Sequence, residues 1–177
     1  MKKSLSISLS ALLLLISFGT AGCTGYQKAQ TAYNVVEGIF AVAQADLPSL
    51  QAAGVFSPQE ATVINAYVSL GQTLTGQYES CITNAQNTML KTSGKFLSCL
   101  TIFSSGLVDP KELAALRVLN PKAQHNVQLW ITAAQIGINS VIAALGGQQS
   151  APVAIAPAPT SAELRVFEQR VRFAAGL

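Results

Sequence analysis

Apolar residues recur at spacings of three and four along most of the chain, and this spacing constrains the fold more than any other feature. It places apolar side chains on one face of an α-helix. No stretch of comparable length alternates apolar and polar residues as a strand would. The four stripes are Tyr33, Val36, Phe40, Ala43 and Leu47; Val63, Tyr67, Leu70, Leu74, Tyr78, Cys81 and Ala85; Phe96, Leu100, Phe103 and Leu107; and Val127, Ile131, Ala134, Ile138, Val141 and Leu145. The sequence therefore predicts an all-α helical bundle of four main helices over residues 23–146, plus short helices such as 111–119.

Helix-start signals separate the stripes. Ser57-Pro58-Gln59-Glu60 is a capping box, in which the Ser57 hydroxyl and the Glu60 carboxylate each accept a hydrogen bond from the other residue's backbone N–H. The stretch Asp109–Glu112 has the same pattern, Thr160–Glu163 has it without the Pro, and Asn120-Pro121 is a further start. Gly146-Gly147 predicts the end of the last main helix.

The composition changes after the fourth stripe. Residues 147–160 hold three Pro among Ala and other small residues, which predicts a flexible Pro/Ala linker. Residues 161–177 then predict a C-terminal amphipathic helix, whose apolar face has three possible destinations: its own bundle, a protein partner or a membrane. Arg165, Arg170 and Arg172 suit an anionic surface. The residues expected to contact a partner or membrane are Leu164, Phe167, Val171, Arg165 and Arg172.

The first 22 residues have the three parts of a secretory signal peptide. Lys2 and Lys3 form a basic head, residues 5–18 are uncharged and mostly apolar, and residues 19–22 are small. A membrane-spanning helix needs about 20 apolar residues, so the apolar part is short for a permanent anchor. We expect residues 1–22 to be a signal peptide.

The end of this segment, Thr20-Ala21-Gly22-Cys23, resembles the lipobox of bacterial lipoprotein precursors. The resemblance covers only the first two dozen residues, and Thr20 stands where Leu is usual. It implies cleavage before Cys23, a diacylglycerol thioether on Cys23 and further acylation with a chain such as palmitate. Thr24, where Asp would signal retention in the inner membrane, implies the outer membrane of a Gram-negative host. Cleavage by ordinary signal peptidase, giving a secreted soluble protein, and an uncleaved anchor are the alternatives.

The other two cysteines, Cys81 and Cys99, lie 18 residues apart and symmetrically about residue 90. A helical hairpin turning near residue 90 would place them opposite each other, and export would supply an oxidising compartment. We expect a disulfide; two buried free thiols are the alternative in a reducing envelope. The chain has no Cys-x-x-Cys motif and one His, so a metal or redox site is not expected.

Charge and motif content narrow the function. Without Lys2 and Lys3 the chain has nine basic against eight acidic residues, and no basic run precedes the C-terminal helix. Nucleic-acid binding is therefore not expected. A catalytic pair of Glu37 and Glu79, or a site around His125, has no supporting motif, so we expect neither an enzyme nor a cofactor.

The sequence thus predicts a non-enzymatic exported lipoprotein with a structural or interaction role at the cell envelope. The alternative within the same fold is a binder of apolar ligands inside the bundle. Its cavity would be lined by Phe40, Leu74, Phe103 and Ile138.

Overall fold

A computed structural model of the chain describes residues 24–87 and 93–175, and these residues form helices and connecting segments with no strand. The expected all-α class is confirmed for this part of the chain. The signal peptide 1–22, Cys23 and the turn near residue 90 lie outside the described residues. The helices are α2 (Gly25–Ala52), α3 (Pro58–Asn87), α4 (Ser93–Leu107), α5 (Pro110–Leu116), α6 (Pro121–Ala144) and α7 (Ser161–Ala175).

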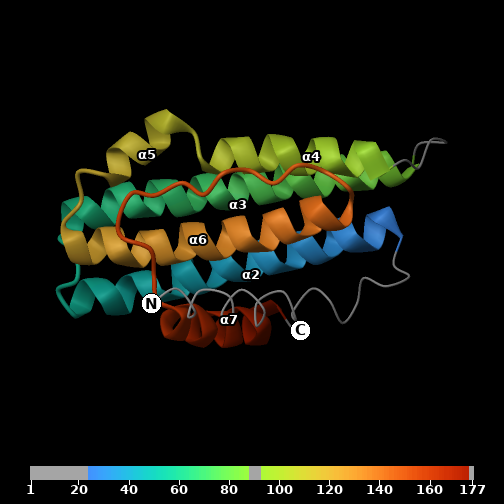
Figure 1. Ribbon diagram of the computed structural model, residues 1–177. Coiled ribbons are helices and arrows are strands. Elements are labelled where there is room, and N and C mark those ends of the chain that lie inside the picture. The colour runs from blue at the N-terminus through green and yellow to red at the C-terminus, as the bar shows by residue number, and fades with distance from the viewer. Residues whose placement is uncertain (1–23, 88–92, 176–177) are drawn as a thin grey trace, which may run out of the picture.

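Helices α2, α3, α4 and α6 lie side by side along one long axis (Figure 1). Helix α2 packs against α3, α4, α6 and α7, and among the described helices it has the largest number of neighbouring helices. The short helix α5 contacts α3 at the end where α4 connects to α6. Helix α7 lies along α2, on the outside of the bundle.

Three of the four apolar stripes face the core as expected. In α4, for example, Phe96, Leu100, Phe103 and Leu107 are all buried. In α3 the buried face is centred one residue later than the expected stripe. Its buried residues are Ala61, Ile64, Tyr67, Val68, Gly71, Thr75, Tyr78, Ile82 and Ala85. The expected positions Val63, Leu70, Leu74 and Cys81 are only partly buried.

A close contact between α2 and α3 explains this register. A Cβ atom added to Gly71 would lie 2.1 Å from Cε1 of Phe40, a distance that no real packing tolerates. Gly71 therefore lets the Phe40 ring approach the α3 backbone. Leu74 lies on the other flank of α3, where a Cβ added to Gly106 of α4 would meet it at 2.8 Å.

The expected helix caps are present. The Ser57 N–H donates to Glu60 Oε2 at 2.8 Å, and the Glu60 N–H donates back to Ser57 Oγ at 3.3 Å. Thr160 and Glu163 make the same reciprocal pair at the start of α7. Asp109 and Asn120 cap α5 and α6 with their side chains. Helix α6 ends at Ala144 and is followed by Gly146, whose φ of 82° is a left-handed conformation that favours glycine.

Residues 147–160 are extended, as expected of a Pro-rich segment, and they run back along α6 (Figure 1). Side chains of α6 hold this segment. Gln128 Oε1 accepts from the N–H of Ile155 at 2.7 Å, and Gln135 Oε1 accepts from the N–H of Val153 at 3.2 Å. Asn139 bonds both the N–H and the C=O of Ser150. The segment expected to be a flexible linker is therefore docked on the bundle, and it returns the chain to the end where α6 begins.

Within the described residues, α6 is the one helix long and apolar enough to cross a membrane by length and composition. More than half of its most apolar window is buried inside the bundle, with Val127, Ile138 and Val141 among its core residues. The central helix of a helical bundle passes the same test.

Candidate functional site

Helix α2 begins directly after the expected lipid-attachment position. Thr24 is its N-cap: the Thr24 N–H donates to Gln27 Oε1 at 2.8 Å, and Thr24 Oγ1 accepts from the Gln27 N–H at 3.3 Å. Thr24 is thus the only residue between Cys23 and the first residue of α2, Gly25. Cys23 itself lies outside the described residues. A group attached there would be joined almost directly to α2.

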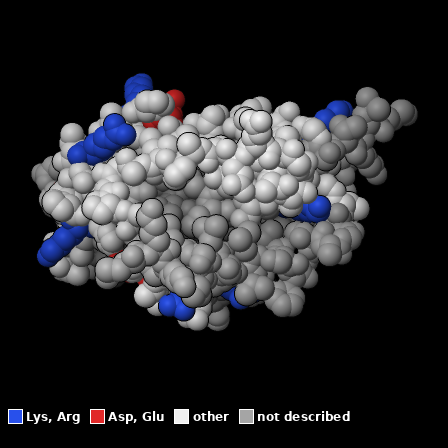
Figure 2. Space-filling model, viewed as in Figure 1, with Lys and Arg blue, Asp and Glu red and all other residues white. Residues whose placement is uncertain are grey.

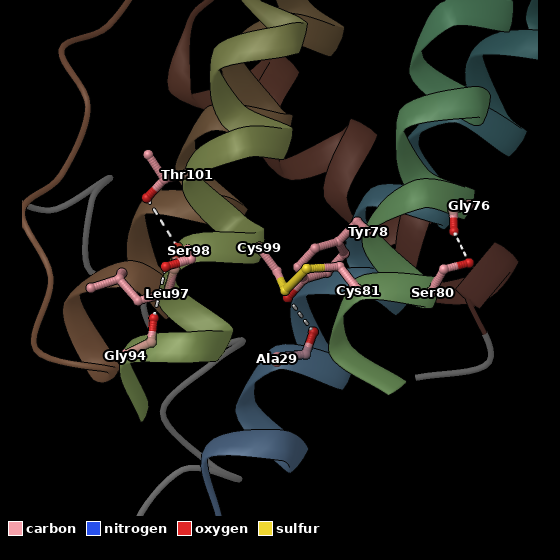
Figure 3. The surroundings of a disulfide bond; sticks show 10 residues. All are labelled: Ala29, Gly76, Tyr78, Ser80, Cys81, Gly94, Leu97, Ser98, Cys99 and Thr101. Atoms are coloured by element: carbon pink, nitrogen blue, oxygen red, sulfur yellow. Dashed lines mark hydrogen bonds between the residues drawn. A yellow bond between two sulfur atoms is a disulfide. The ribbon is translucent and has the colours of Figure 1, made fainter. Parts of the chain in front are cut away.

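The expected disulfide between Cys81 and Cys99 is present, with Cα atoms 5.8 Å apart. It joins α3 to α4, and its surroundings are drawn in Figure 3. Tyr78 lies one turn before Cys81, and its hydroxyl donates to the backbone oxygen of Ala29 at 2.8 Å. The cross-link and this buried hydrogen bond together tie α3 to both α4 and α2.

The apolar face of α7 packs on the chain's own bundle. Phe167 and Val171 are buried, and Leu164 is half-buried. Gly38 of α2 makes the approach possible, because a Cβ added there would lie only 3.1 Å from the backbone oxygen of Val171. Of the five residues expected to contact a partner, Phe167 and Val171 are therefore covered while α7 stays docked. Arg165 and Arg172 are exposed.

Two polar contacts hold the docked helix. At its start, His125 Nε2 of α6 lies 2.8 Å from Glu163 Oε1, with both side chains about two-fifths exposed. At the middle, Arg170 forms a bidentate ion pair with Asp46 of α2. Hydrogen bonds from Thr160, and then from His125, lower the pKa of Glu163 to about 2.

The outer side of α7 carries a second apolar pair that the sequence analysis missed. Val166 is 61% exposed and Phe173 is 90% exposed, two of the four large apolar side chains exposed in the described chain. They line a groove of about 440 Å³ between α7 and α2, with Gln169, Arg170, Ala174 and the small α2 residues Ala41, Val42 and Ala45. The seven-residue separation of Val166 and Phe173 could have indicated that they share one side of the helix. The sequence analysis considered only the longer apolar stripe through Phe167 and Val171.

Figure 2 shows the surface charge on one face of the molecule. On that face, the described surface over α4, α6 and residues 147–160 is largely uncharged, with basic side chains at its margins, including the edge where α7 lies. Arg165 and Arg172 are exposed on α7. The candidate functional site is therefore the outer face of α7 with its groove against α2.

The sequence also raised Glu37 and Glu79 as a catalytic pair, and the structure brings both close to Tyr33. Partial burial and the two carboxylate charges, together with hydrogen bonds to them, raise the pKa of Tyr33 to about 12. The phenol therefore stays protonated and serves as a hydrogen-bond donor. Glu37 and Glu79 are exposed, and Tyr33 and Glu37 line a groove of about 330 Å³ between α2 and α3. His125 is elsewhere, beside Glu163.

Near the position expected for an apolar ligand, the described residues surround a small cavity. An enclosed cavity beside Phe40, Trp130 and Gln135 has a volume of about 10 Å³, which is room for about one water molecule. Of the four residues expected to line a ligand cavity, only Phe40 lines this one. Gln135 Nε2 is buried without a hydrogen-bond partner in the described part of the chain. Trp130 is buried.

No family model, curated protein or solved structure matches the chain.

Proposed function

We propose that this chain is a non-enzymatic exported lipoprotein, held at the bacterial cell envelope by acyl chains on Cys23, with a structural or interaction role. The observation that carries the proposal is the lipobox-like stretch Thr20–Cys23 after a basic and apolar leader. Thr24 caps α2 directly after Cys23, so an acyl group on Cys23 would be joined to the bundle through one residue. By the same resemblance, Thr24 favours the outer membrane where the host has one.

The disulfide supports export. Disulfides persist in oxidising compartments and are rare where thiols are kept reduced. The pairing of Cys81 with Cys99 also leaves Cys23 as the remaining cysteine, free to carry a thioether. Two or three acyl chains hold a protein stably, since each buried methylene contributes about 0.8 kcal/mol.

The test is the intact mass of the protein taken from its native membrane fraction, with and without reductant. The expected mass corresponds to a chain starting at Cys23 with diacylglycerol and a further acyl chain, and it rises by two hydrogens on reduction. A Cys23→Ser chain is the matched control, since it keeps the leader but has no thiol to modify. An unacylated chain in the soluble fraction would favour the secreted alternative, and a mass that retains residues 1–22 would favour an uncleaved anchor.

A further inference from the structure

We propose that the outer face of α7 is a second membrane contact, which lays α7 and the adjoining part of α2 on an anionic lipid surface. Four residues form this face, which we call the α7 outer face: Arg165, Val166, Arg172 and Phe173. The proposal relies on the proposed function only for the presence of a membrane near the protein.

The apolar side chains of the proposed membrane contact come from two positions on α7. Val166 and Phe173 are separated by two helical turns, so they lie on one side of α7, opposite the buried pair Phe167 and Val171. An exposed Phe beside a groove lined by alanines and a valine offers the shallow apolar insertion that interfacial helices use.

The arginines of α7 provide positive charge that complements an anionic lipid surface. Arg165 and Arg172 are exposed, and they lie about 100° around α7 from Val166 and Phe173, on the other edge of the outward face. Among the nearby carboxylates, Asp46 is paired with Arg170 and Glu163 lies beside His125, whereas the half-buried Glu168 interacts electrostatically with Arg172. The α7 outer face therefore presents an apolar edge, Val166 and Phe173, beside a basic edge, Arg165 and Arg172, which suits acidic lipid headgroups.

The position of α7 on α2 makes this contact compatible with an anchor at Cys23. The groove residues Ala41 and Ala45 lie about 30 Å along α2 from Thr24, at 1.5 Å per residue. Because Thr24 caps α2 directly after Cys23, the anchor and the α7 outer face are two points on one rigid helix. Contact at both points would place α2 roughly parallel to the membrane.

A second copy of the chain is a poorer occupant. Stable interfaces bury at least about 1,200 Å² in total, and two exposed apolar side chains per copy supply little of this. A symmetric dimer through this face would also bring Arg165 and Arg172 of one copy toward the same residues of the other.

The test uses the chain from residue 23 with Cys23→Ser, which contains every described residue and no acyl group. Binding is measured by co-sedimentation with vesicles of phosphatidylglycerol, and with vesicles of phosphatidylcholine, up to millimolar lipid. We expect binding to phosphatidylglycerol that weakens with salt, and little binding to phosphatidylcholine. Phe173→Ser should reduce the affinity about tenfold. Arg165→Gln and Arg172→Gln should each reduce it about fivefold.

Ile102→Ser on α4 is the matched control, because Ile102 is also a large apolar side chain with 65% exposure. It should leave binding unchanged, and equal circular dichroism should confirm that all variants fold. Absence of binding by the parent chain, equal binding by Phe173→Ser, or equal binding to both lipids overturns the proposal. So does a dimer in sedimentation that Phe173→Ser converts to a monomer. Because this chain carries no acyl group, failure here is distinct from failure of the mass test on Cys23.

Discussion

The carboxylate of Glu60 caps its own helix and also holds Asn120, the cap of another helix 60 residues later. Glu60 Oε1 accepts from the Asn120 N–H at 2.6 Å and from its Nδ2 at 3.0 Å. The amide oxygen of Asn120 accepts from the N–H groups of Lys122 and Ala123. The starts of α3 and α6 are thereby joined through two side chains, each of which also satisfies its own helix end.

This relationship predicts a loss of stability in acid. Hydrogen bonds from the backbone of Ser57, then of Asn120, lower the pKa of Glu60 to about 2, while in the unfolded chain it stays near 4.5. The unfolded state therefore binds more protons between these values. The contribution of Glu60 is complete above about pH 4.5 and disappears as the pH falls toward 2. Glu163 acts in the same direction.

The measurement is the urea midpoint of unfolding at pH 7 and at pH 3. A Glu60→Gln, Glu163→Gln double variant should lose less stability than the parent between these two pH values. Equal losses would show that other carboxylates are responsible.

Asn120→Ala should lower the free energy of unfolding by about 1–2 kcal/mol at pH 7, because it removes the N-cap of α6.

A pair of glycines in α3 predicts opposite effects of the same substitution. Gly71→Ala should destabilise the protein by about 1–3 kcal/mol, because its new methyl group would overlap the Phe40 ring. Gly76→Ala should stabilise it by about 1 kcal/mol, since nothing lies within 4 Å of a Cβ there and Ala is the better helix former. Chemical denaturation of both variants checks the sign. A stabilising Gly71→Ala would contradict the close packing of α2 on α3.

The disulfide predicts a dependence on reductant. It closes a loop with a sequence separation of 18, for which chain-entropy arguments give about 3 kcal/mol. Adding dithiothreitol, or replacing Cys81 and Cys99 by Ser, should lower the free energy of unfolding by about this amount. The double Ser variant should not respond to dithiothreitol. A parent protein that also fails to respond would show that the bond contributes nothing to folding.

The hydrogen bonds from α6 to residues 147–160 predict that substitution of Gln128 loosens this segment locally. Gln128→Leu removes the acceptor for the N–H groups of Ile155 and Ala156, and the donor to the Val153 carbonyl. Buried groups left without partners cost about 1–3 kcal/mol.

Amide hydrogen exchange should accelerate at Ile155 and Ala156 in this variant. The control is Gln77→Leu, since Gln77 is an exposed glutamine on α3. Unchanged exchange in Gln128→Leu would mean that the segment is held mainly by its apolar contacts.

Much of the fold could be predicted because its signals are local. A capping box involves residues three positions apart, so the motifs at Ser57 and Thr160 correctly predicted the starts of α3 and α7. The pairing of Cys81 with Cys99 followed from their symmetry about one turn. Such features depend on a few neighbouring residues, which the sequence displays directly.

The rest depended on contacts between distant segments. The expected stripe of α3 was correct at Tyr67, Tyr78 and Ala85, but it missed the core positions Gly71 and Thr75, which an apolar pattern does not count. The bonds from Glu60 to Asn120, and from Gln128 to residues 153–156, depend on the topology. At the candidate site, Phe167 and Val171 were recognised as an apolar face, but only their burial on α2 revealed that Val166 and Phe173 are the exposed pair.

The disulfide between α3 and α4 offers a way to monitor export of the protein across the inner membrane. On the proposed route, a molecule still in the cytoplasm carries Cys81 and Cys99 as free thiols, and a molecule that has crossed the inner membrane carries neither. A bulky thiol-reactive label would then add mass at these two positions only to the untranslocated population. The pair would thus act as an internal record of export, readable on a gel without a reporter fusion.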